Sequence, residues 1–174
     1  MACENTKFVF DFIVTENKKE SPSLIANKNI FNCSKLLRVE SPKTDHVDSK
    51  DYAVIQLDRK VDGRTPLKLR SEGQLNINDS VIMIGHPLGL PLKIAGNAGV
   101  RSIEDIFFRA NLDAFGGNSG SPVINAKSLE VEGMLVDGEI DFAEDSDGYC
   151  YVSKKCNDNS CSGELSMLMS AVPF

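Results

Sequence analysis

The sequence predicts an all-β protein, and three observations carry this prediction. Short apolar runs rich in β-branched and aromatic residues recur along the chain. Turn-forming stretches such as VDGRTP and GHPLGLP divide these runs. Only one short stretch has the pattern of a helix, so the chain lacks the alternation of helices and strands that marks a parallel α/β fold. Many short strands without intervening helices indicate a β-sandwich or β-barrel.

The expected elements follow from this pattern in chain order. In the first expected strand, aromatic side chains at Phe8, Phe10 and Phe12 alternate with other residues. A polar stretch at 69–80 has no strand pattern and marks a change of structural unit. The one expected helix spans Gly163–Ala171. The expected strands are Lys7–Thr15, Ile30–Glu40, Tyr52–Leu57, Ser80–Ile84, Ile94–Val100, Ile106–Asn111, Pro122–Ile124, Glu130–Val136 and Tyr149–Val152.

Composition excludes several classes of function. Hydrophobic residues make up 41% of the 174 residues, which is typical of a folded domain with a core. The net charge is −6 and no basic run is present, so the chain is not expected to bind nucleic acid. No apolar run is long enough to span a membrane. The first residues, MACENTKFVFDF, lack the features of a signal peptide.

The chain has five cysteines, three of which lie within the stretch CYVSKKCNDNSC. This spacing suits zinc poorly, because a fourth ligand and close pairs of ligands are missing. A disulfide between two of Cys150, Cys156 and Cys161, in an exported protein, fits better. The odd number leaves one thiol unpaired. We expect neither a metal nor a cofactor.

The stretch DAFGGNSGSPVIN, residues 113–125, places Ser119 among closely spaced glycines. A nucleophile elbow of the form G-x-S-x-G would need glycine at Ser121 and a helix after the serine, and neither condition is met. The remaining interpretation is a serine on a tight loop directly before a strand. In such a loop the backbone N–H groups of Gly117 and Ser119 can point into one pocket and stabilise an oxyanion. The less specific alternative is a glycine-rich turn that contains a serine by chance.

Three stretches together resemble the chymotrypsin/trypsin clan of serine peptidases. GGNSGSPV is similar to the nucleophile motif of its bacterial trypsin-like and glutamyl-endopeptidase-like members, and DYAVIQL is similar to the aspartate motif. VEGMLVDGE resembles the strand along which substrate backbone lies. The resemblance implies a double β-barrel, with the remainder of an incomplete N-terminal barrel at 1–75 and a C-terminal barrel at 76–174. It implies Ser119 as nucleophile, Asp51 as the acid that orients the base, and Gly117 with Ser119 as oxyanion hole.

The mechanism of this clan also requires a histidine base. His46 lies in a charged loop five residues before Asp51, and His86 follows Asp51 in a turn, so neither occupies the place of the clan's base. We expect that the base lies upstream of the strand at Phe8, on strands that this sequence lacks. Cys3 would then have lost its disulfide partner, and the open edge of the N-terminal barrel would allow self-association.

The resemblance further implies a peptide or protein substrate and a secreted or periplasmic location. Asp113 precedes Ser119 by six residues, the spacing at which trypsin-like members place the acid that pairs with a substrate Arg or Lys. Substrate backbone would lie along Val136, Asp137 and Gly138. The acids that follow are interpreted as a solvated loop: Asp137, Glu139, Asp141, Glu144 and Asp145. The alternative function is a protease homologue without activity that binds peptides or protein partners.

Overall fold

The computed structural model describes residues 3–15, 24–41, 49–157 and 160–174. The chain forms two compact units, each described by itself below. The first contains residues 1–66, 90–92 and 172–174, and the second contains 67–89 and 93–171. The regular structure in both consists of strands and short 3-10 turns, which confirms the all-β prediction. In the described ranges no helix has the length and apolar character needed to cross a membrane.

The first unit contains a three-stranded antiparallel sheet in the order β1-β2-β3, formed by Lys7–Val9, Ile30–Glu40 and Tyr52–Leu57. Its described residues form an open sheet rather than a closed barrel. The first strand ends earlier than predicted, because Asp11 adopts a φ of 62°, a left-handed conformation that interrupts an extended strand. Short 3-10 turns precede β1 and β2 at Cys3–Asn5 and Asn27–Asn29.

The expectation that Cys3 lacks a partner is wrong. Cys3 forms a disulfide with Cys33 of β2 across 30 residues of sequence, and the backbone N–H of Cys33 donates to the carbonyl of Thr6. Phe31, two residues before Cys33 in the same strand, is buried and packs edge-on against Phe10 at 5.1 Å between ring centroids. The unit therefore has a small core of its own, covalently tied to its first residues.

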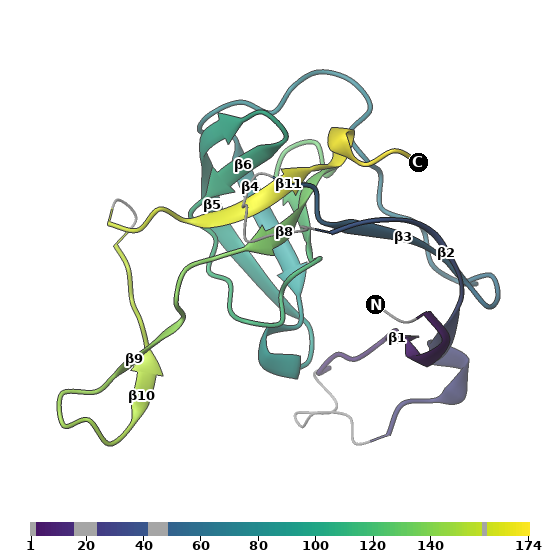
Figure 1. Cartoon of the computed structure of the whole chain (residues 1–174), viewed down its shortest axis with the longest axis horizontal. Helices are drawn as coiled ribbons and strands as arrows, with labels where there is room; N and C mark the ends of the chain where they lie inside the picture. The colour runs from purple at the N-terminus through teal and green to yellow at the C-terminus, as the bar shows by residue number, and fades with distance from the viewer. Residues whose placement is uncertain (1–2, 16–23, 42–48, 158–159) are drawn as a thin grey trace. The chain divides into compact units, whose positions relative to one another are not determined.

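The second unit is a closed barrel of six strands in the order β11-β6-β5-β4-β7-β8. Figure 1 labels β4, β5, β6, β8 and β11 of this barrel. All neighbouring strands are antiparallel. Closure removes the free edges that would otherwise attract other strands. The interior is filled by buried apolar side chains, among them Val81, Val100, Phe108, Val123 and Leu135. The six strands are β4 (Ser80–Gly85), β5 (Lys93–Glu104), β6 (Phe107–Ala110), β7 (Pro122–Asn125), β8 (Val131–Asp137) and β11 (Glu164–Leu168).

The predicted helix at Gly163–Ala171 is wrong. This segment forms strand β11, which pairs with both β6 and β8, followed by a single 3-10 turn, η4, at Met169–Ala171. Gly163 has a φ of 83° and lies so close to the Ala110 carbonyl that a Cβ would be 2.6 Å from its oxygen. Barrel closure thus decides the conformation of a sequence whose own preference is weak.

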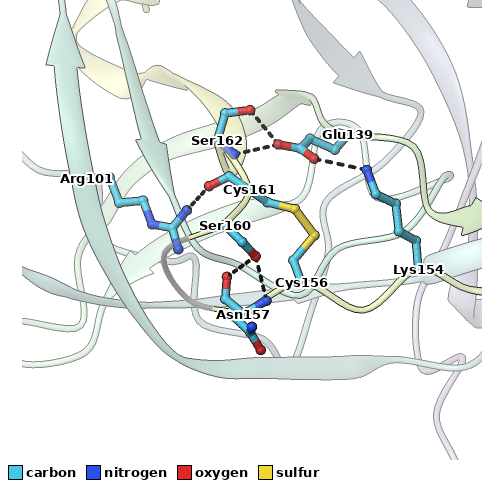
Figure 2. Close-up of a disulfide and its surroundings, with 8 residues drawn as sticks. All are labelled: Arg101, Glu139, Lys154, Cys156, Asn157, Ser160, Cys161 and Ser162. Atoms are coloured by element: carbon cyan, nitrogen blue, oxygen red, sulfur yellow. Dashed lines mark hydrogen bonds and ion pairs between the residues drawn. A yellow bond between two sulfur atoms is a disulfide. The ribbon is translucent and has the colours of Figure 1, made fainter.

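A two-stranded hairpin, β9 (Phe142–Glu144) and β10 (Tyr151–Ser153), interrupts the second unit between β8 and β11. The sequence predicted β10 two residues early and missed β9, which lies within the acidic stretch. After the hairpin in the sequence, Cys156 and Cys161 form a disulfide, which confirms the predicted pairing within this cluster (Figure 2). Cys150 is the free cysteine and is exposed. Because the disulfide uses both sulfurs, neither offers a thiolate to a metal beside Glu139.

The polar stretch before β4 is fixed to the barrel by an ion pair. Leu69 forms an isolated parallel bridge with Val131, and the guanidinium of Arg70 binds both carboxylate oxygens of Glu132. Glu132 is fully buried, and the bidentate contact supplies the charge and donors that its carboxylate needs there. The interaction with Glu132 also raises the pKa of Arg70.

Candidate active site

The serine motif folds as two consecutive turns. The N–H of Asn118 donates to the Phe115 carbonyl at 3.1 Å, and the N–H of Ser121 donates to the Asn118 carbonyl at 2.8 Å. Glycine occupies the third position of each turn, Gly117 with a φ of 91° and Gly120 with a φ of 86°. A type II turn needs a positive φ at that position, which glycine adopts without steric cost. Ser119 is the second residue of the second turn and is exposed.

Strand pairing holds the downstream side of this loop. The Gly120 N–H donates to the Leu135 carbonyl at 2.7 Å, and the Leu135 N–H donates to the Ser121 carbonyl at 3.0 Å. Beneath the loop, Asn118 is buried, and a Cβ at Gly85 would lie 2.3 Å from its Oδ1. Ser119 therefore stands on a loop bonded to β8 and packed closely against the end of β4.

The amide groups of Gly117 and Ser119 are the predicted oxyanion donors. No hydrogen bond among the described residues uses either amide. Both would therefore remain able to donate to a substrate atom. Convergence of the two N–H groups on one point stays a prediction.

A cavity of about 190 Å³ opens beside Ser119. The structure places the predicted substrate-contact residues Val136, Asp137 and Gly138 in its lining, together with Ser119. Asp113 does not line this cavity but an adjoining one of about 440 Å³. Of the predicted site residues in the second unit, Asp113 and Gly117 are thus not part of the lining of the cavity that borders Ser119.

Glu164, at the start of β11, lines both cavities. Its carboxylate lies against Gly138, where a Cβ would overlap Oε2 at 1.8 Å, so only glycine leaves room for it. Burial, followed by the negative charge of Asp141, raises the pKa of Glu164 to about 7. Sequence analysis missed this residue because it assigned the segment to a helix. Leu165, Ser166 and Met167 are all buried, so β11 shows no simple alternation of buried and exposed residues, and no local sequence signal pointed to Glu164.

Two acids of the stretch interpreted as a solvated loop make specific contacts. Asp141 accepts a hydrogen bond from the Gly116 N–H at 2.7 Å. Glu139 binds the backbone and hydroxyl of Ser162 and forms an ion pair with Lys154 at 3.5 Å (Figure 2). The hydrogen bonds from Ser162 lower the pKa of Glu139, and the nearby charge of Lys154 lowers it to a smaller degree. The acidic stretch is therefore partly structural.

The remaining predicted residues lie as follows. Asp51 is exposed and directly precedes β3 in the first unit. His86 directly follows β4 in the second unit, and its carbonyl oxygen lies 3.5 Å from where a Cβ of Gly117 would be. His46 lies outside the described residues.

Comparisons with known proteins agree with the fold. The structure is similar to Rv3671c of M. tuberculosis, a protease, in its active form, with a TM-score of 0.55 and 16% sequence identity over 83% of this chain and 57% of that chain. It is also similar to a mutant of Rv3671c in an inactive form, with a TM-score of 0.53 and 16% identity over 84% of this chain and 63% of that chain. For kallikrein-related peptidase 10 the TM-score is 0.53, with 14% identity over 83% and 75% of the two chains.

The fold is thus that of the chymotrypsin-like peptidases, which confirms the predicted fold class. The sequence matches the family described as trypsin-like peptidase domain over residues 13–134, and the chain belongs to this family. It spans about 57–63% of the length of the two Rv3671c chains. A comparison with curated proteins found no significant sequence match.

Proposed function

We propose that the protein is a serine endopeptidase with Ser119 as its nucleophile. The observation that carries this proposal is the position of Ser119 on its glycine turn, at the cavity that Val136, Asp137 and Gly138 also line. Oγ of Ser119 bonds to the scissile carbonyl carbon, and its proton passes to an imidazole base and then to the leaving amine as the C–N bond breaks. Water then hydrolyses the acyl ester.

The other roles in this proposal are divided between the units. The amides of Gly117 and Ser119 would bind the oxyanion, and Asp51 would orient the imidazole. The base itself is proposed to come from protein sequence upstream of Phe8. Of the two histidines, His86 lies between β4 and the 3-10 turn η3 (Pro87–Gly89).

Substrate preference is proposed to be for a cationic side chain next to the cleaved bond. The described residues that line the cavity beside Ser119 include four carboxylates and no Lys or Arg: Asp137, Glu139, Asp141 and Glu164. Glu164 is the half-buried member, and a lysine or arginine side chain would offset the cost of its ionisation. Asp113, which resembles the trypsin-like specificity acid, lines only the adjoining cavity. We therefore assign the preference to Glu164 ahead of Asp113.

Cleavage of paired peptides tests this function. The protein, expressed with its upstream coding sequence, is given peptides that differ only in Lys, Gln or Glu at one position, beside a Ser119→Ala control. We expect cleavage after Lys that disappears in S119A and loses its preference for Lys over Gln in Glu164→Gln. Equal cleavage by S119A would refute Ser119 as nucleophile. Preference for Glu would refute the assigned substrate class.

Two further parts of the proposal concern setting and assembly. The two disulfides are compatible with an oxidising, secreted or periplasmic location. Among the described residues no further strand pairs with β1 or β3, and two copies could associate through these edges. Peptide binding without cleavage, by the wild type and S119A alike, would instead identify a homologue that holds peptides along β8.

A further inference from the structure

Gly116 lies between Phe115 and Gly117 in the serine loop, and both of its backbone polar groups form hydrogen bonds. The Gly116 N–H donates to Oδ2 of Asp141 at 2.7 Å, and the Gly116 carbonyl accepts from the Leu88 N–H at 2.7 Å. Leu88 lies in η3 and Asp141 directly precedes β9, so two separate segments of the second unit fix this one residue.

These contacts determine the direction of the next amide. The described residues contain no cis peptide bond, so the Gly116 carbonyl and the Gly117 N–H point in opposite directions from one planar peptide. Because that carbonyl points to Leu88, the Gly117 N–H points away from Leu88. A Cβ on Gly117 would also lie only 3.2 Å from the Leu88 nitrogen, which shows how closely the two segments approach.

An aromatic contact reinforces the Asp141 bond. Phe142, the next residue after Asp141, packs against Phe115, the residue before Gly116, with ring centroids 5.7 Å apart. The dipeptide Asp141-Phe142 therefore contacts Phe115-Gly116 through one hydrogen bond and one aromatic pair. Gly116 itself is exposed, so without Asp141 its N–H would turn to water.

We propose that Asp141 is a positioning residue, which acts with Leu88 to hold the Gly116–Gly117 peptide in the orientation that leaves the Gly117 N–H free for a substrate oxyanion. If this peptide turned over, the Gly117 N–H would point to Leu88 and the pocket would lose one donor. Removal of one oxyanion donor typically lowers kcat by about 10²–10³. The inference rests on the proposed function for its catalytic meaning, but the orientation itself can be measured without activity.

Amide signals of the glycines provide that measurement. In protein labelled with ¹⁵N-glycine, Asp141→Ala should speed solvent exchange of the Gly116 amide by about tenfold, the typical worth of one hydrogen bond to a charged group. It should also shift the Gly117 amide signal. Asp141→Asn keeps an acceptor oxygen and should restore both. Glu144→Ala, an exposed acid on the same hairpin, should change neither. Unchanged Gly116 and Gly117 signals in D141A would overturn the proposal.

Reaction with a fluorophosphonate separates this inference from the proposed function. With the base present, we expect labelling of Ser119 to slow in D141A by about tenfold or more and to recover in D141N. Equal labelling of D141A and wild type would overturn the positioning role. Absence of labelling in the wild type, with the expected glycine signals, would refute the proposed function and leave the orientation by Asp141 supported.

Discussion

At the scale of single residues, the serine motif is explained by backbone conformation. Gly117 and Gly120 stand at equivalent positions of two turns and both have positive φ. They differ in their surroundings: a Cβ on Gly117 would crowd Leu88 at 3.2 Å, whereas a Cβ on Gly120 would meet nothing within 4 Å. Gly120 is thus required by its backbone conformation alone, whereas Gly117 is required by its conformation and by the lack of space for a Cβ.

The two glycines make a matched pair of variants. Gly120→Ala should lower the free energy of unfolding by about 1–2 kcal/mol, the cost of a left-handed alanine. Gly117→Ala should lower it further, because the Leu88 backbone must also move. Chemical denaturation of both variants measures the difference. Equal losses would show that the approach to Leu88 has no energetic consequence.

Glu164 should make stability depend on pH. Its pKa is raised from 4.5 to about 7, so the folded protein favours the protonated acid. The contribution of Glu164 to the free energy of unfolding is therefore complete below about pH 4.5 and is lost as the pH rises through about 7. Since the side chain is only half-buried, we expect a loss of about 1–2 kcal/mol.

Denaturation between pH 4.5 and 8 tests this expectation. Glu164→Gln should lose most of the decrease, whereas Glu144→Gln, at an exposed position, should retain it. An identical pH profile for E164Q and the wild type would contradict the raised pKa.

Sequence alone predicted Ser119, Gly117 and the strand with Val136 as site residues because their spacing is local and carries a recognisable motif. It did not identify Asp141 or Glu164. Both act through residues at least 25 positions away, Gly116 for Asp141 and Gly138 for Glu164, and these contacts form only when the barrel closes. Asp113 was chosen by spacing from Ser119, and the structure places it in the neighbouring cavity.

At the scale of elements, the two disulfides differ in the length of chain that they close. Cys3–Cys33 spans 30 residues, and Cys156–Cys161 spans 5. Loop-closure entropy predicts a larger stabilisation for the longer loop.

The sequence predicted most strands well where β-branched and aromatic residues dominate, as in β2 and β3. It failed at β9 and β11, whose residues extend only because a neighbouring strand pairs with them.

Serine variants of each cysteine pair test the contribution of the disulfides. Replacing Cys3 and Cys33 should cost about 3.5 kcal/mol of unfolding free energy, and replacing Cys156 and Cys161 about 2 kcal/mol. Cys150→Ser serves as the control, because this cysteine is free and exposed. Chemical denaturation of the whole protein measures the unfolding free energy of each double-serine variant, followed by a signal from the unit that contains the pair. A larger loss for the short loop would show that Glu139, Ser162 and the chain around them depend on the bond more than loop entropy predicts.

At the scale of the whole molecule, the nucleophile loop and the acidic cavity belong to one closed barrel, and Asp51 belongs to the other unit. The barrel carries three parts of the proposed site: Ser119, the amides of Gly117 and Ser119, which no hydrogen bond among the described residues uses, and the acidic cavity beside Ser119. The imidazole base of the proposed mechanism is not among these parts. We therefore predict that Ser119 reacts slowly in the 174-residue chain and faster when an imidazole base is present.

The most direct test of Ser119 as nucleophile is mass-spectrometric mapping of a fluorophosphonate adduct. The printed chain, its Ser119→Ala and His86→Ala variants, and a form extended by its upstream coding sequence are treated side by side. We predict one adduct, on Ser119, formed slowly and equally in the printed chain and H86A, much faster in the extended form, and not at all in S119A. An adduct on another residue, or fast labelling of the printed chain that H86A abolishes, would contradict the account.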